Sequence, residues 1–211
     1  MIAIIDYGMG NLASVAKAIT FLGGRATITS DPQAVSRAKA IIFPGVGAFG
    51  EAMEELKSRR LVDPLTGAVR EGKPFLGLCL GLQLLFSSSE ESSGVRGLGV
   101  LPGRVKRLPP RRGLKVPHMG WNQMVRVSHA RAGRGDLLRG VPDGAFMYFV
   151  HSFVAEPEAQ ETICAVTDYG KRFASVISNG KNVWATQFHP EKSQRWGLKI
   201  LKNFLSEVCT C

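Results

Sequence analysis

The stretch that most constrains this chain is a short apolar run, residues 75–78, which leads directly into Cys79. A compact apolar run of this length is typical of a buried strand. From Leu80 onwards, apolar residues recur at helical spacing instead. Gly77 and Gly81 flank the cysteine, and glycines tolerate the strained backbone of a sharp turn. The sequence therefore predicts a strand, a tight turn at Cys79 and a helix.

A cysteine at such a turn is well placed for nucleophilic chemistry. A sharp strand-to-helix turn pushes its central side chain out beyond the end of the sheet. The helix that follows directs free N–H groups and the positive end of its dipole at the sulfur. Both favour the thiolate, which is the nucleophile. The alternative is a small apolar side chain packed at a strand end, since free cysteines are often buried. The presence of a suitable base elsewhere in the chain would favour the nucleophile over the packed side chain.

Residues 1–86 alternate apolar runs with helical patterns, which predicts a parallel sheet with right-handed crossovers. We expect strands at 1–6, 26–29, 38–43 and 75–78, and helices at 12–22, 49–59 and 61–70. Ligands of such sheets bind at the carboxyl ends of the strands. The turn at 6–8, the loop at 44–50 and Cys79 all fall at that edge.

The glycine-containing turns at this edge have alternative interpretations. Gly8 and Gly10 fit the start of a dinucleotide-binding pattern, but Ala13 stands where the third glycine is required. The loop at 44–50 presents backbone N–H groups that suit a phosphate or a developing oxyanion. It lacks the Lys-Ser/Thr pair of a phosphate loop, and a plain connecting turn is the third interpretation.

The second half of the chain changes character. Residues 87–99 are polar and glycine-rich, and we expect a surface loop there. Strands are then expected at 104–108, 124–127, 145–153, 163–167, 173–178 and 183–188, with a hairpin turn at 178–182 and a closing amphipathic helix at 193–208. No repeat or linker interrupts the sequence. We therefore expect one domain, 1–211, with an open, mostly parallel (mixed) α/β sheet flanked by helices and a β-rich second half.

Composition narrows the class of protein. The chain has 211 residues, 45% apolar and 21% charged, as is usual for globular proteins. It opens without a basic leader, and no apolar run approaches the roughly 18 residues of a membrane span, so we expect neither a signal peptide nor a membrane segment. The four cysteines show no disulfide or metal pattern. This predicts reduced thiols, no metal or cofactor, and a cytoplasmic location.

The net charge of +10 is the unusual figure, and much of it lies in 104–115 and 126–139. No nucleic-acid-binding motif accompanies it, and no aromatic residues alternate with the charges. We therefore expect a solvated basic surface or a docking face for an acidic partner, and no nucleic-acid ligand.

The end of the last expected strand offers the base that Cys79 requires. His189 follows that strand, Glu191 comes two positions later, and Pro190 restricts the turn between them. A cysteine nucleophile needs a base to take its proton, and the base needs a group that holds its tautomer. Cys79, His189 and Glu191 fit these roles. Three other histidines compete for the role of base on counting alone: His118, His129 and His151.

These blocks resemble a known family. Gly-Leu-Cys-Leu-Gly at 77–81 and Phe-His-Pro-Glu at 188–191 look like class I glutamine amidotransferases, whose Cys-His-Glu triad lies on an open, flavodoxin-like α/β sheet. Five blocks narrow the resemblance to the glutaminase subunits of imidazole glycerol phosphate synthases: 6–12, 43–49, 118–122, 148–153 and 187–193. They extend over the chain from end to end. The basic stretch 109–115 is less typical of the family.

The resemblance implies roles for individual residues. Cys79 attacks the side-chain amide of glutamine, His189 acts as base and then acid, and Glu191 orients His189. The implied donors to the oxyanion are Val46, Gly47 and Leu80. The implied substrate-binding residues are Gly45, Gln83, Ser152 and Phe153.

The resemblance also implies a partner. A cyclase subunit, a (β/α)8 barrel, would form a heterodimer with this chain and receive the ammonia through an internal channel. It would make imidazole glycerol phosphate and the purine intermediate AICAR in histidine biosynthesis, and activity would stay low until the partner binds its ligand. Asn11, Trp121 and Lys192 are the implied contact residues, although Trp121 also fits a core position.

Three other functions remain open. A non-catalytic regulator on the same fold is disfavoured by the intact Cys79, His189 and Glu191. A stand-alone thiol hydrolase of peptides or γ-glutamyl compounds would need no partner for its activity. A glutaminase of another pathway, such as anthranilate, pyridoxal phosphate or nucleotide synthesis, is disfavoured by the Gly-Trp-Asn block at 120–122 and by Gly-Val-Gly at 45–47.

Overall fold

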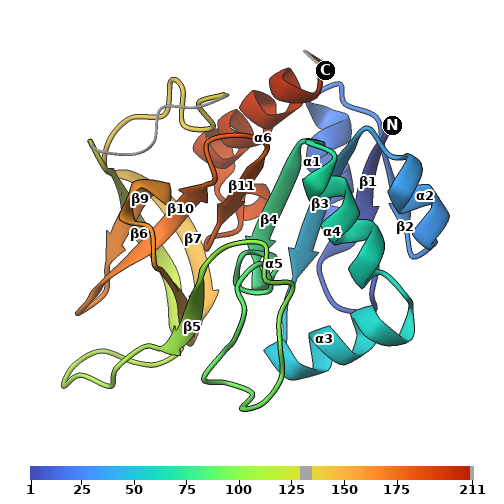
Figure 1. Ribbon diagram of the computed structural model, residues 1–211. Coiled ribbons are helices and arrows are strands. Elements are labelled where there is room, and N and C mark those ends of the chain that lie inside the picture. Colours follow the sequence, from blue (N-terminus) through green and yellow to red (C-terminus); the bar gives the residue numbers. More distant parts are fainter. Residues whose placement is uncertain (129–134, 210–211) are drawn as a thin grey trace.

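A nine-stranded sheet runs through the computed structural model, which describes residues 1–128 and 135–209 (Figure 1). Its strand order is β2-β1-β3-β4-β11-β10-β9-β6-β7, and β5 and β8 form a second, two-stranded sheet. The strands are β1 (Ile2–Ile5), β2 (Ala26–Thr29), β3 (Ala40–Gly45), β4 (Phe75–Cys79), β5 (Gly103–Arg107), β6 (His118–Arg126), β7 (Ala145–His151), β8 (Phe153–Pro157), β9 (Ile163–Asp168), β10 (Arg172–Ser178) and β11 (Val183–Thr186).

Helices cover both faces of the parallel half of the sheet. They are α1 (Leu12–Phe21), α2 (Pro32–Arg37), α3 (Phe49–Ser58), α4 (Val62–Arg70), α5 (Leu80–Gln83) and α6 (Gln194–Cys209), with short 3₁₀ turns η1 (Gln160–Thr162) and η2 (Pro190–Lys192). On β1, Ala3 and Ile5 pack in a core shared with α2, α3 and α4. Ile2 and Ile4 pack on the opposite side, with α1 and α6. The continuous apolar runs of the sequence follow from this, because a parallel strand is buried on both faces.

The parallel strands bring the predicted site segments to one edge. β1 pairs in parallel with β2 and β3, β3 with β4, and β4 with β11. The register aligns Gly45 of β3 with Cys79 of β4, and Leu78 of β4 with Thr186 of β11. The loop after β3, the cysteine and the segment after β11 are therefore neighbours at the carboxyl ends of adjacent strands.

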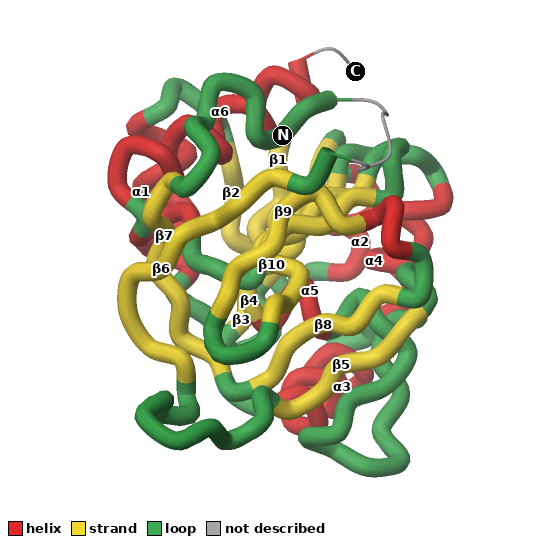
Figure 2. The backbone as a smooth tube through the Cα atoms, turned by 90° about the vertical axis from the view of Figure 1, so that its left-hand side faces the viewer, coloured by secondary structure: helices red, strands yellow, loops and turns green. Residues whose placement is uncertain are grey.

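The remaining strands are antiparallel. β10 and β11 form the predicted hairpin, and the sheet continues through β9, β6 and β7. Figure 2 shows β5 and β8 side by side, below and to the right of β9 and β10 in that view. The sheet is therefore mixed, as expected, with a β-rich second half.

The structure corrects the sequence prediction at several elements. Helix α2 was not predicted, because it has only six residues and too little periodicity to detect; the Asp31 carboxylate caps it by accepting two backbone N–H groups. Strand β6 begins at His118 rather than at residue 124, and pairing with β7 sustains that extension. The expected strand 145–153 breaks at Ser152, so that β7 and β8 enter different sheets. The elbow helix α5 has a single turn.

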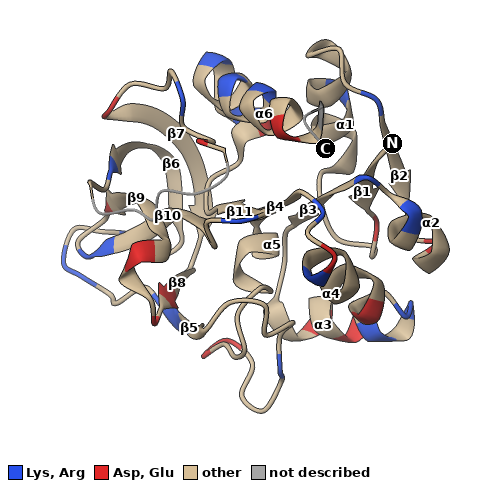
Figure 3. Cartoon of the chain, turned by 45° about the horizontal axis from the view of Figure 1, so that its top comes forward, with Lys and Arg blue, Asp and Glu red and all other residues tan. Residues whose placement is uncertain are grey.

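Charge is distributed unevenly over the surface. Lys and Arg lie along α6, and acidic residues gather on α3 (Figure 3). Glu156 pairs with three basic residues around β5 and β8: Arg104, Lys106 and Lys171. These cations lower the pKa of the Glu156 carboxyl, with Lys106 contributing most. Part of the basic excess at 104–115 is thus neutralised within the chain.

Residues 1–128 and 135–209 carry neither a membrane-spanning helix nor a metal site. None of their helices combines the length and apolarity that crossing a bilayer requires. No group of three or more His, Cys, Asp or Glu side chains in these ranges is arranged as a metal site.

Candidate active site

The predicted turn at Cys79 is confirmed, and its geometry is strained. Cys79 has φ 54° and ψ −105°, in a region that side-chain-bearing residues rarely occupy. A Cβ on Gly81 would lie 1.8 Å from the Phe43 carbonyl oxygen, and one on Gly77 would lie 2.9 Å from the Gly81 oxygen. The two glycines therefore allow α5 to lie directly against β3 and β4, with the cysteine held at the corner.

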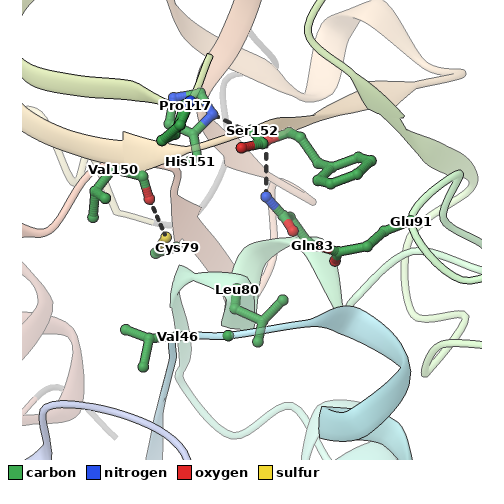
Figure 4. Close-up of a pocket in the computed structure, with 11 residues that line it drawn as sticks. Val46, Cys79, Leu80, Gln83, Glu91, Pro117, Val150, His151 and Ser152 are labelled. Carbon is green, nitrogen blue, oxygen red and sulfur yellow. Dashed lines mark hydrogen bonds between the residues drawn. The ribbon is translucent and has the colours of Figure 1, made fainter.

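The sulfur of Cys79 is buried, with 5% of the residue exposed, between a donor and an acceptor. Sγ lies 3.7 Å from the Val150 carbonyl oxygen (Figure 4) and 3.9 Å from Gln187 Nε2. No side chain caps α5, so the first N–H groups of this helix are not occupied by a capping oxygen. The sulfur therefore faces one amide donor, from Gln187, beside the uncapped start of α5.

His189 and Glu191 form a buried pair after the end of β11. His189 Nδ1 lies 2.9 Å from Glu191 Oε1, and the two side chains are 4% and 2% exposed. Burial lowers the pKa of His189, but Cys79 and Glu191 together outweigh it and raise that pKa to about 10. His189 Nε2 nevertheless has no partner at hydrogen-bond distance among the described residues. The carboxylate thus accepts from Nδ1–H, and the raised pKa makes His189 a strong base whose Nε2 meets no competing partner among the described residues.

Strand β7 fixes the backbone around His189. The His189 N–H donates to the Tyr148 carbonyl oxygen at 3.0 Å. Ser193 Oγ donates to the His189 carbonyl at 2.7 Å and accepts from the Tyr148 N–H at 3.0 Å. Two hydrogen bonds from β7 and one within the turn segment therefore set the position of the imidazole.

The loop after β3 is tightly packed against the β1–α1 turn. A Cβ on Gly45 would lie 2.1 Å from the Tyr7 hydroxyl. Gly47 has φ 96°, and a Cβ there would lie 2.4 Å from Met9 Cε. Val46, between them, is 40% exposed. Glycine is thus required at both positions. With glycine there, the loop stays beside Cys79, where the β3–β4 register places it.

A cavity of about 240 Å³ lies beside Cys79 (Figure 4). Most of the predicted site residues line it: Val46, Gly47, Cys79, Leu80, Gln83, Ser152 and Phe153. Gln83 Nε2 donates to the Phe153 carbonyl oxygen at 2.9 Å. The predicted oxyanion and substrate residues are therefore brought together, and Gly45 adjoins them as the last residue of β3.

Glu91 is a cavity residue that the sequence analysis missed. Among the described residues lining the cavity, it alone carries a carboxylate. Its Oε2 accepts from the Phe49 N–H at 2.8 Å, and Ser92 Oγ accepts from the Gly50 N–H at 3.0 Å. The loop 87–99 thereby caps α3, whose own N-cap residue Ala48 provides no side-chain cap. A glutamate in a serine-rich loop carries no local signal of this contact.

Two of the three competing histidines are excluded as the base by their hydrogen bonds. His118 and His151 are buried and joined to each other, with His118 Nδ1 3.0 Å from His151 Nε2. His151 Nδ1 also contacts the Phe153 carbonyl oxygen, so neither of its nitrogens is free to take a proton from Cys79. His129 lies outside the described residues.

Two of the three expected contact residues meet at one aromatic ring. Trp121 is 46% exposed, so its alternative interpretation as a core residue is wrong. Its ring centroid lies 6.0 Å from that of Tyr148, and Lys192 Nζ lies 5.8 Å from the same Tyr148 ring. Asn11 instead caps α1, accepting from the Ser14 N–H at 3.4 Å.

Comparison with known proteins fits this geometry. Residues 3–208 match the family described as glutamine amidotransferase class-I. The chain is 53% identical over 208 residues to the imidazole glycerol phosphate synthase subunit HisH of Methanothermobacter thermautotrophicus, covering 99% of each chain. It is also 53% identical over 203 residues to the HisH subunit of Moorella thermoacetica, covering 96% of this chain and 93% of that one. The chain is a class I glutamine amidotransferase.

Solved structures agree with this family at the level of the fold. One described as a glutamine amidotransferase superposes on this amidotransferase with a TM-score of 0.74 at 19% identity, covering 98% of both chains. PurLQS from Thermotoga maritima gives a TM-score of 0.74 at 15% identity, covering 97% of both. At such identities the likeness concerns the fold alone, and the predicted fold class is confirmed.

Proposed function

We propose that this amidotransferase hydrolyses glutamine to glutamate and ammonia through Cys79, as the glutaminase subunit of an imidazole glycerol phosphate synthase. The observation that carries the proposal is the buried His189–Glu191 pair, which follows the strand next to that of Cys79. Nε2 of this pair has no competing partner in the part of the chain that the structure describes. The HisH relatives, similar over nearly the whole chain, support this pathway over other glutaminases.

In the first step, Cys79 Sγ attacks the side-chain amide carbon of glutamine while His189 Nε2 takes the thiol proton. The carbonyl oxygen becomes an oxyanion, and backbone N–H groups of Leu80 and of the Val46–Gly47 loop stabilise it. The intermediate then collapses with cleavage of the carbon–nitrogen bond. His189 passes its proton to the departing nitrogen, so that ammonia leaves and a glutamyl thioester remains.

In the second step, water attacks the thioester carbon and neutral His189 accepts a proton from it. The carbon–sulfur bond breaks, the proton returns to the sulfur, and glutamate leaves. Glu191 takes no proton in either step. It holds the Nδ1–H of His189 and stabilises the imidazolium that forms transiently.

The cavity offers complementary groups to both charged substituents on the α-carbon of glutamine. The Glu91 carboxylate suits the α-ammonium group, because an ionised partner strengthens such a hydrogen bond. The strand break at Ser152 and Phe153, held by Gln83, offers backbone groups to the α-carboxylate. Substrate binding thus needs a loop from each half of the chain.

The ammonia passes to a partner. A cyclase subunit, a (β/α)8 barrel, forms a heterodimer with this chain and uses the ammonia to make imidazole glycerol phosphate and AICAR in histidine biosynthesis. The exposed Trp121, with Tyr148 and Lys192 beside it, supports docking on the β6–β7 edge, where Val150 also approaches Cys79. Asn11, at the start of α1, is the third proposed contact residue. The chain acts as one domain, in the cytoplasm, without a metal or cofactor.

The test is glutamate release by the purified chain, alone and with its cyclase subunit loaded with a substrate analogue. We expect low activity alone and a rise of orders of magnitude in the complex. Cys79→Ser should lose activity by roughly thousands-fold or more while remaining folded. Cys164→Ser is the matched control and should keep full activity, because Cys164 lies away from the cavity, on β9.

Each other outcome points to another function. Full glutamine turnover by Cys79→Ser would refute the role of Cys79 as the nucleophile. Strong activity without the partner would indicate an independent amidase, and no activity in either state would favour a non-catalytic regulator.

A further inference from the structure

Two buried histidines outside the proposed catalytic pair form the middle of a continuous hydrogen-bonded chain. His118 opens β6 and faces His151 at the end of β7; they are 2% and 6% exposed. Besides the contact between the two rings, His151 Nδ1 lies 3.0 Å from the Phe153 carbonyl oxygen. Asn122 Nδ2 lies 3.3 Å from His118 Nε2. All four ring nitrogens therefore have partners.

The partners fix the tautomers of both rings. A carbonyl oxygen only accepts, so His151 Nδ1 carries a proton towards Phe153 and His151 Nε2 is the acceptor. His118 Nδ1 must then donate to His151, and His118 Nε2 accepts from the Asn122 amide. Every donor faces an acceptor only when both rings are neutral. Burial lowers the pKa of His118 to about 4 and, helped by its neighbour, that of His151 to about 3, which keeps both neutral at physiological pH.

This chain of hydrogen bonds ends at the nucleophile. The Phe153 carbonyl oxygen accepts from His151 and also from Gln83 Nε2, at 2.9 Å. Gln83 Nε2 lies 3.4 Å from Gln187 Oε1, and Gln187 Nε2 lies 3.9 Å from Cys79 Sγ. The segment at which the strand breaks is thus held by Gln83 from one side and by the histidine pair from the other.

We infer that His118 and His151 are positioning residues that hold the segment 150–153 in the geometry that binds glutamine. The inference rests on the proposed function, because its effect is measured on glutamine. Without the Nδ1–H of His118, the buried Nε2 of His151 loses its donor, and an unpaired buried acceptor drives rearrangement of the ring. The Phe153 carbonyl would then lose one of its two donors, and the binding segment would shift.

Packing is the alternative role for His118. Its ring stacks between those of Phe149 and Tyr169, at centroid distances of 4.9 and 4.0 Å. A ring that served only to fill this space would be replaceable by another aromatic ring with no effect on glutamine. The two roles therefore predict opposite effects on KM for glutamine in variants that remove either the hydrogen bonds or the stacking.

Two variants separate these roles. His118→Phe keeps an aromatic ring between Phe149 and Tyr169 but removes the hydrogen bonds. His118→Asn loses the stacking but keeps an N–H close to the position of Nδ1. In the complex with the cyclase subunit, we expect His118→Phe to raise KM for glutamine about tenfold with kcat within about twofold, as for one lost hydrogen bond on a binding segment. His118→Asn should keep the wild-type KM and melt at a lower temperature.

The outcomes distinguish failure of this inference from failure of the proposed glutaminase function. A wild-type KM in His118→Phe would overturn the inference, and so would a KM that follows the loss of stability in both variants. An inactive wild-type complex would refute the proposed function instead.

A second measurement needs no variant to fold. Nitrogen-15 NMR of the imidazoles in the unmodified chain should show both His118 and His151 neutral, with the proton on Nδ1, at pH 7. A proton on Nε2 in the neutral form of either ring, or a charged ring, would overturn the inference.

Discussion

Gly81 is the position at which a single methyl group should damage both the fold and the activity. A Cβ there would lie 1.8 Å from the Phe43 carbonyl oxygen, whereas contacts below 3.0 Å are essentially never found. The elbow must therefore move by about 1.2 Å away from β3 in Gly81→Ala. A backbone carbonyl cannot rotate aside, so we expect a loss of about 3 kcal/mol in the free energy of unfolding, at the upper end of overpacking costs.

Both consequences are measurable. With a urea slope of about 2 kcal/mol per M, the midpoint of unfolding should fall by about 1.5 M. The chain should still fold, because domains of this kind have about 5–15 kcal/mol of stability. Helix α5 carries Leu80 and Gln83, and a displacement of about 1 Å typically costs about 100-fold in rate. Glutaminase kcat/KM in the complex should fall by that order.

Gly67 provides the matched control. It lies within α4, and a Cβ there would meet no atom within 4 Å. Gly67→Ala should raise stability by about 0.5–1 kcal/mol, since alanine is the better helix former. It should leave kcat/KM unchanged. If Gly81→Ala matched Gly67→Ala in both measurements, the argument that α5 packs directly on the β3 backbone would be refuted.

Three further predictions concern the partner face, a buried hydroxyl and acid stability. Trp121→Ala should weaken binding of the cyclase subunit, measured by calorimetry, by about 30-fold or more, as for an interface hot spot, without lowering the urea midpoint. Phe21→Ala removes another exposed aromatic ring and is the control, which should bind the cyclase subunit normally. Tyr7→Phe should leave the urea midpoint unchanged or raise stability by about 1 kcal/mol, because the buried Tyr7 hydroxyl has no partner among the described residues; a lower midpoint would contradict this. The pKa values of His118 and His151 are lowered in the fold to about 4 and 3, so the unfolded chain binds more protons below pH 6.5. Their contribution to stability is present above pH 6.5 and is lost as the pH falls towards these values. The urea midpoint of the unmodified chain should therefore drop between pH 7 and pH 5, and that of His118→Phe should drop by less. An equal drop in the unmodified chain and in His118→Phe would contradict this prediction.

Local chemistry made the elbow predictable. The period of the apolar residues changes from strand to helix at Cys79, and Gly77 and Gly81 mark the close packing that the structure then shows. The hairpin at 178–182 was equally readable, because its turn residues are adjacent in the chain. Helix α2 escaped prediction for the opposite reason, since six residues provide less than two turns of periodicity.

The break at Ser152 depends on distant strands. The run 145–153 is uniformly strand-like in sequence, and its division follows from β7 pairing with β6 while β8 pairs with β5. Those partners lie tens of residues away, so no local pattern records them. The break matters for function, because it brings Ser152 and Phe153 into the cavity beside Cys79.

The sequence alone determined the class of fold, the candidate nucleophile and its base, because each of these is written in a local period or a short motif. Only the tertiary structure decided what surrounds them. It brought Glu91 from a serine-rich loop to the cavity, excluded His118 and His151 as the base by occupying their nitrogens, and left Nε2 of His189 without a competing partner among the described residues. Such contacts join residues far apart in the chain, and they become visible only when strand pairing has set their register.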